Sequence, residues 1–304
     1  MIEAGLIAAR FAHYAALVLA FGALAYASYG ERSDNVRRSM GRLGFASSLV
    51  LLLAVGAVLA MTVAGLGGSL ASLSDPTLWS AVIQETDFGR VWLARLLMAL
   101  ALVAVGLAVW RRPLRALNRL GLLFASGLVV TIALTGHAQV EEGASGLVHR
   151  IADAAHLVAA AVWLGALTPL LFLLGTSASG TAEDSRIAAA RLQGFHSVGL
   201  AAVLVLVLTG IVNSWFLVGS PERLVTTTYG VVLLAKVVLF AVMVGLAADN
   251  RLRLVPALKR GLNSGVDARD SLAQLRKRIR GELALGMLVL LAVAVLGGIA
   301  PASA

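Results

Sequence analysis

Five ionisable residues in this sequence have the types and the spacing of a metal site. Four are histidines and one is an aspartate, and all fall in or beside apolar stretches: His13, His137, His149, Asp153 and His156. Ionisable side chains are costly inside a bilayer and usually face the interior of a helical bundle or a cavity. Imidazole nitrogens with a carboxylate form a donor set that suits copper or zinc. Three of them, His149, Asp153 and His156, are spaced for one helix face. Because the histidines come from three predicted spans and fall at one level of the membrane, the sequence predicts a metal site there.

Soft and acidic residues elsewhere in the chain could support such a site. Met61 lies near the end of an apolar stretch and could add a thioether ligand for Cu(I). Glu141 and Glu142 follow His137 closely and could attract cations to the mouth of the site. The fifth histidine, His196, falls at the opposite predicted side of the membrane, where a role as an interfacial cap explains it.

Two basic residues and one amide also lie inside apolar stretches. Arg95 and Lys236 are each one to two helical turns from the end of their stretch. Each either extends its charged group to the lipid headgroups or pairs with Asp153 or a carboxylate at the mouth, which would tune the charge of the site. Asn213 follows Thr209 by one turn, and both could hydrogen-bond across helices.

The composition identifies the elements that must position these residues. The chain has 304 residues, of which 59% are hydrophobic and 13% charged, with a mean hydropathy of +0.89 and no cysteine. A soluble domain carries about 25% charged residues, so a soluble enzyme and a disordered chain are excluded, as are disulfides and thiolate metal sites. Eight stretches approach the roughly 20 apolar residues that a membrane helix needs: Leu6–Tyr29, Leu43–Gly65, Val91–Trp110, Leu120–Ala138, Ile151–Leu174, His196–Val218, Tyr229–Ala248 and Leu283–Ala300. We therefore expect an all-α polytopic membrane protein.

The distribution of basic residues predicts the orientation. Most of the 25 Lys and Arg residues fall in the connections on one side, which places both termini in the periplasm by the positive-inside rule. The net charge of +9 then reflects topology and anionic lipid, and no motif for nucleic-acid binding accompanies it. The longest basic connection, 251–282, is expected on the cytoplasmic side. Its Val266, Leu272, Leu275 and Ile279 suit a short helix on the membrane surface, and a solvated basic loop is the alternative.

Two pieces of the chain recur at nearly one offset. Arg10–Val18 is similar to Arg150–Val158, and Thr86–Arg95 is similar to Thr227–Lys236. These matches predict a 4+4 parallel repeat, with halves 1–138 and 139–304 related by a pseudo-two-fold axis along the membrane normal. The predicted metal site would be asymmetric, because His13 aligns with Asp153.

Four segments resemble, in order, elements of the bacterial CopD (copper resistance D) membrane proteins. They are Thr135–Ala138, His156–Leu167, Gly210–Trp215 and Thr228–Lys236, with Asn250 and Arg251 closing that helix. The resemblance implies an eight-helix inner-membrane protein that handles copper, together with a separate periplasmic CopC-type protein that delivers the metal. The family's histidines carry over to His137 and His156 by motif, whereas position and spacing support His13.

The residues and the resemblance together favour copper transport, with uptake as the favoured direction. In this hypothesis His13, His137 and His156, helped by Asp153, bind periplasmic copper and pass it inward between the two halves. The predicted inner side shows no second ligand set. One alternative is a b-type haem protein that passes electrons to quinone, because paired transmembrane histidines are also axial haem ligands. Another is a copper-binding scaffold for assembly of a copper enzyme. No hydrolase constellation is visible, so we expect no enzymatic activity.

Overall fold

The computed structural model describes residues 1–29, 34–112, 114–136, 143–178, 182–264 and 269–303. Within these ranges the chain is helical and contains no strand, and eight helices are long and apolar enough to cross a membrane. The long helices are α1 (Ile2–Tyr29), α2 (Asp34–Leu66), α4 (Asp87–Arg111), α5 (Arg115–Ala133), α6 (Gly143–Ala178), α7 (Ala182–Val218), α9 (Thr228–Asp249) and α11 (Arg269–Leu296). Short elements join them: η1 (Leu70–Ser74), α3 (Pro76–Glu85), α8 (Arg223–Thr226), η3 (Asn250–Leu254) and α10 (Val255–Asn263). The predicted all-α polytopic membrane architecture is confirmed.

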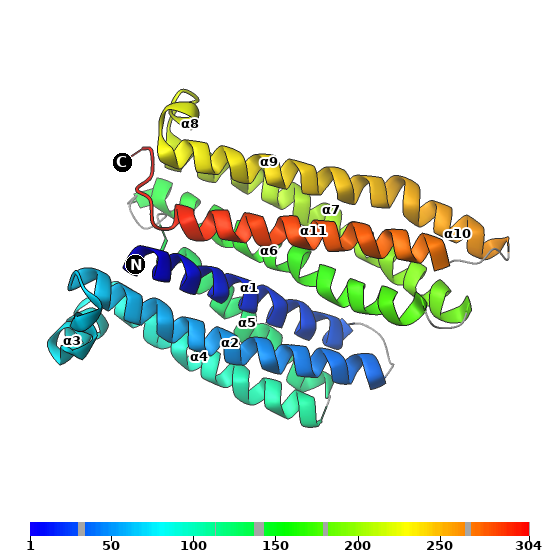
Figure 1. Cartoon of the computed structure of the whole chain (residues 1–304), viewed down its shortest axis with the longest axis horizontal. Helices are drawn as coiled ribbons and strands as arrows, with labels where there is room; N and C mark the ends of the chain where they lie inside the picture. Colours follow the sequence, from blue (N-terminus) through cyan, green and yellow to red (C-terminus); the bar gives the residue numbers. More distant parts are fainter. Residues whose placement is uncertain (30–33, 113, 137–142, 179–181, 265–268, 304) are drawn as a thin grey trace.

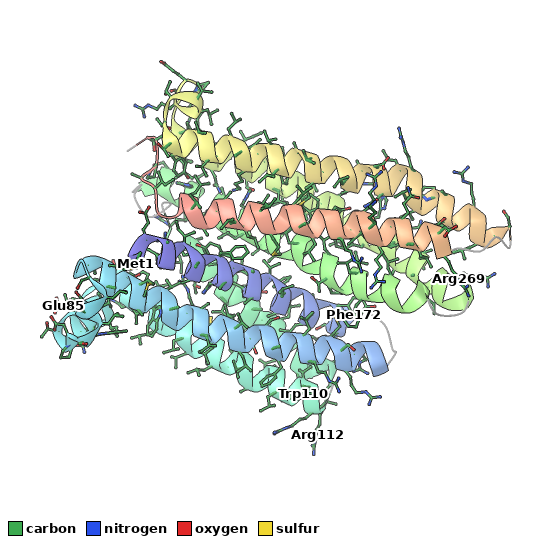
Figure 2. All side chains as sticks on the ribbon, viewed as in Figure 1. Met1, Glu85, Trp110, Arg112, Phe172 and Arg269 are labelled. Atoms are coloured by element: carbon green, nitrogen blue, oxygen red, sulfur yellow. The ribbon has the colours of Figure 1, made fainter. Side chains whose placement is uncertain are left out.

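Both termini lie at one end of the bundle with α3 and α8, and α10 lies at the other (Figure 1). We call these the termini end and the α10 end. Arg112 and Arg269 are at the end opposite Met1 and Glu85 (Figure 2). The α10 end is therefore the one that the positive-inside rule assigns to the cytoplasm.

Several helix ends differ from the predicted spans. Helix α5 ends at Ala133 and the chain turns through Leu134–Gly136, so the helix stops before the predicted Ala138. Helix α11 ends at Leu296, where Gly297 and Gly298 interrupt the predicted span. At the α10 end, by contrast, α7 and α11 begin well before their apolar windows. A hydropathy window reports the stretch that fits the bilayer, and polar helical turns continue beyond it.

The segment 251–282 is largely helical, in place of the surface helix or solvated loop that we expected. Helix α9 continues through η3, which is π-helical, into α10, and α11 begins at Arg269. Leu272, Leu275 and Ile279 belong to α11 and are buried in the core with residues of α6 and α10. Their spacing forms an apolar stripe that extends the core-facing side of α11, which is why they pack inside. Val266 lies outside the described residues.

The helices of the two halves pair in the same order. Helix α1 packs on α2 and α5 as α6 packs on α7 and α11, and α4 packs on α5 as α9 packs on α11. Helices α1 and α6 join the halves. The pattern departs at one place: α2 lies along α4, whereas α7 and α9 barely touch. The second set of helices is therefore open between α7 and α9.

Glycines allow the close joint between α1 and α6. A Cβ built on Gly22 would lie 1.8 Å from the carbonyl oxygen of Gly165, so the two backbones are in direct contact there. A Cβ on Gly165 would lie 3.0 Å from the carbonyl oxygen of Val18. Any larger residue at Gly22 would push the two helices apart. Gly165 lies in the segment on which the family resemblance rests, directly after the buried Trp163 and Leu164.

The second pair of matched segments folds in the same way in both halves. The Gly89 amide donates to Thr86 Oγ1 at 2.9 Å, and the Gly230 amide donates to Thr227 Oγ1 at 3.0 Å. Each threonine thus caps its helix, with nearly identical backbone angles. Each glycine also touches the backbone of the short helix before it, where a Cβ would not fit. These caps set the starting points of α4 and α9, the helices that carry Arg95 and Lys236.

Candidate functional site

A cavity of about 660 Å³ lies in the second half, where α7 and α9 are apart. It is lined by α1, α5, α6, α7, α9 and α11, and it extends from the α7–α8 connection at the termini end to the middle of the bundle. Most of its wall is apolar. Its polar lining residues include five that we call the polar cluster: His149, Asp153, His156, Asn213 and Lys236. An apolar pocket with a few converging polar groups is typical of a binding site.

Asp153 on α6 lies where two other helices and the turn after α5 meet. Asn213 of α7 donates from Nδ2 to Asp153 Oδ1 at 3.2 Å. Lys236 and Tyr229 of α9 lie within electrostatic range of the same carboxylate. Gly136, just after α5, approaches from a further side, since a Cβ there would be 4.0 Å from Asp153 Oδ2. Lys236 is therefore near enough to Asp153 for their charges to interact.

His156 is held in one tautomer by Thr209 on α7. His156 Nδ1 is 2.9 Å from Thr209 Oγ1, and Thr209 Oγ1 donates its own proton to the Val205 carbonyl at 2.6 Å. With the hydroxyl proton in that bond, Nδ1 carries the ring proton and donates it to Thr209. The lone pair of the imidazole is then on Nε2, which is the arrangement found in metal-ligating histidines. Gly210 lies against the ring, where a Cβ would be 3.6 Å from Cε1.

His13 is on α1 and is not among the residues that line the cavity. It is 2% exposed, and its Nε2 is buried with no hydrogen-bond partner among the residues that the structure describes. Arg95 of α4 is within electrostatic range of the ring. The guanidinium is bonded to Thr131 Oγ1, to the Thr131 carbonyl and to Thr135 Oγ1, at 2.7–3.1 Å. Arg95 is therefore fixed on α5 and does not extend to the headgroups.

The other predicted ligands are placed less favourably for a shared metal. His149 is buried and its ring stacks on Phe216 of α7, with centroids 4.7 Å apart. Met61 packs its sulfur over Gly5, two turns before His13 on α1. Within the described ranges, no group of three His, Cys, Asp or Glu side chains is close enough to hold a metal ion.

Three of the predicted site residues, His137, Glu141 and Glu142, lie outside the described residues.

The structure also adds polar and aromatic residues that the sequence analysis did not select. Tyr14 and Tyr229 line the cavity near Asp153. A second cavity of about 170 Å³ near the α10 end is lined by Asn250 and Glu282, both buried. Glu282 is the residue before the predicted span Leu283–Ala300, so its burial was not visible in the apolar pattern.

The family comparisons match most of the chain. The family described as "Copper resistance protein D-like, N-terminal domain" matches residues 1–147, and "Copper resistance protein D" matches residues 189–296. Copper resistance protein D of Pseudomonas syringae pv. tomato is 36% identical over 97% of this chain and 96% of its own length.

Two further relatives were found. Inner membrane protein YebZ of Escherichia coli is 32% identical over 83% of this chain and 85% of its own length. Copper transport protein CutJ of Bacillus subtilis is 28% identical over 97% of this chain and 52% of its own length. No solved structure matches the chain. With eight apolar helices among its described residues, the chain belongs to the copper resistance protein D (CopD) family and is a copper-handling multi-pass protein of the inner membrane.

Proposed function

We propose that this protein carries copper across the inner membrane, with uptake from the periplasm as the direction. One observation supports the polar cluster as the entry site: the Thr209 bond leaves His156 Nε2 ready to bind a cation beside a cavity that reaches the termini end. Copper is the substrate in this proposal, and no enzymatic step is needed.

The donor atoms fit copper in kind. His156 and Asp153 line the same cavity, and His13 offers a buried ring nitrogen without a hydrogen-bond partner in the described part of the chain. Nitrogen and carboxylate ligands suit Cu(II), and imidazole also serves Cu(I). We propose that His137 completes the set, because Gly136 lies beside Asp153.

Positively charged residues near these donors oppose the binding of a cation. Arg95 is close to His13, and Lys236 is close to Asp153. In a low-dielectric interior, these positive side chains would repel a bound copper ion. We propose that Glu141 and Glu142 supply the balancing negative charge at the mouth. We further propose that a separate periplasmic CopC-type protein delivers copper to this end.

Metal analysis of purified protein tests the binding site. We expect wild-type protein to retain copper, with nitrogen and oxygen ligands in its X-ray absorption spectrum. The triple variant of His13, His137 and His156 to alanine should lose this copper. His196→Ala, at the α10 end, is the matched control and should keep it. An unchanged copper content in the folded triple variant would refute the site.

Transport itself needs a separate measurement. Removal of the gene should lower cellular copper if the protein takes copper up. Copper binding without any change in cellular copper would favour the scaffold for copper-enzyme assembly instead.

A b-type haem protein is the second candidate, and the large apolar cavity with a histidine, His156, in its wall favours it. Haem would give the purified protein a Soret band. A colourless preparation excludes this candidate.

A further inference from the structure

The second cavity contains a buried carboxylate that the copper-entry site does not use. Glu282 of α11 is 3% exposed and Asn250 of η3 is 8% exposed, and both line this cavity. Asn250 Nδ2 donates to Glu282 Oε1. Asn250 Oδ1 is buried and has no hydrogen-bond partner among the described residues. Two oxygen-bearing side chains thus meet at one cavity, one of them with an acceptor atom left unsatisfied.

The backbone is irregular at the same place. Residues 250–254 form a π-helical segment between two α-helices, and Pro256 lies at the start of α10. Proline has no amide proton and its ring clashes with the carbonyl four residues earlier, so the regular pattern cannot continue through it. Single π-turns inside α-helices often occur at functional sites. Here the irregular turn carries Asn250, whose side chain meets Glu282.

The two cavities are neighbours along the opening between α7 and α9. Trp163 of α6 lines both of them. Its ring meets Phe240 of α9 edge to face, with centroids 5.7 Å apart and planes at 87°. Phe240 lines the first cavity, and Val244, one turn further along α9, lines the second. An aromatic pair therefore stands between the polar cluster and the Asn250–Glu282 pair.

We propose that Glu282 and Asn250 form a second cation site, which receives copper from the first cavity and releases it at the α10 end. The inference rests on the proposed transport function and supplies an inner position for the ion. A carboxylate buried among apolar groups is costly without a cation or a proton, and a passing cation would neutralise it.

The donors suit release more than retention. The two proposed ligands, Glu282 and Asn250, both offer oxygen atoms. Hard oxygen ligands hold copper less firmly than a set of imidazoles. Arg251 also lines this cavity, and its charge opposes tight binding of a cation.

Copper flux into proteoliposomes, measured together with the copper content of the protein, tests this proposal. Glu282→Gln keeps an oxygen that accepts the Asn250 Nδ2 bond but removes the negative charge. We expect a fall in initial flux of about tenfold or more, with copper at the polar cluster unchanged. Asp249→Asn is the matched control. Asp249 is a neighbouring carboxylate that pairs with Arg253 and Arg278, and its loss should leave the flux near the wild-type value.

A second variant tests the site in the opposite sense. Asn250→Asp adds a carboxylate, so we expect it to retain additional copper and to release it more slowly. Wild-type flux in the folded Glu282→Gln protein, or wild-type flux and copper content in Asn250→Asp, would overturn the inner site. An equal loss of flux in Asp249→Asn and Glu282→Gln would also overturn it. Absence of flux in the wild-type protein would instead refute the proposed transport function.

Discussion

The contact between Gly22 and Gly165 can be tested by adding a single methyl group. In Gly22→Ala the new Cβ would lie 1.8 Å from the Gly165 carbonyl oxygen and 2.4 Å from its carbon. Both obstacles are backbone atoms, so no side-chain rotation can relieve the clash. Ordinary contact begins at 3.4 Å, which requires α1 and α6 to separate by roughly 1.6 Å at this point.

The cost follows from the packing that this separation opens. Val18 and Leu164 are 6% and 4% exposed and belong to the same core cluster at this joint. A buried leucine makes 40–60 contacts of about 0.1–0.2 kcal/mol, and a gap of about 1 Å forfeits up to half of that energy. One such side chain would lose about 3 kcal/mol of packing energy. Because the surrounding helices relax only in part, we expect Gly22→Ala to lower the free energy of unfolding by about 3 kcal/mol. At roughly 2–4 °C per kcal/mol, the melting temperature should fall by about 6–12 °C.

Thermal unfolding in detergent, followed by tryptophan fluorescence, measures this effect. Gly56→Ala is the control, because a Cβ on Gly56 of α2 meets no atom within 4 Å. Alanine is the better helix former by about 1 kcal/mol, so the control should be neutral or slightly stabilising. Equal melting temperatures for the two variants would refute the argument that the α1–α6 joint depends on backbone contact.

Two further predictions concern single hydroxyl groups. Thr209→Val removes the acceptor that orients His156, and we expect a roughly 10- to 100-fold loss of copper affinity in a competition titration. Thr62→Val is the control, because it loses only a bond to its own helix, and it should bind copper normally. Thr86→Ala and Thr227→Ala each remove a helix cap and should lower the free energy of unfolding by about 1 kcal/mol. Because the two caps share one geometry, the two losses should be equal in size. Clearly unequal losses of unfolding free energy, measured by chemical denaturation, would contradict the equivalence of the caps.

Part of the candidate site follows directly from residue type and spacing. The interval between Asp153 and His156 predicted that both face one way, and both line the same cavity. Asn213 was expected to bond across helices, and it binds Asp153. These predictions succeed because helical periodicity and the cost of polar groups in lipid are local properties.

Other parts of the site depended on the packing of distant helices. Arg95 could have extended to the headgroups, and only the position of α5 showed that Thr131 and Thr135 bind it. Glu282 stands at the edge of its apolar stretch, and its partner is 32 residues away. The tautomer of His156 likewise depends on a threonine of another helix. No periodicity within one segment contains such information.

By itself, the sequence determined that the chain crosses a membrane eight times and that His156 and Asp153 share a helix face, because apolar length and the 3.6-residue period act within one segment. The tertiary structure decided that α7 and α9 stand apart, that a cavity lies where they separate, and that Asn250 binds Glu282. These features arise from helix pairing across long chain separations. A contact between distant segments, such as that of Gly22 with Gly165, determines which helix surfaces pack together.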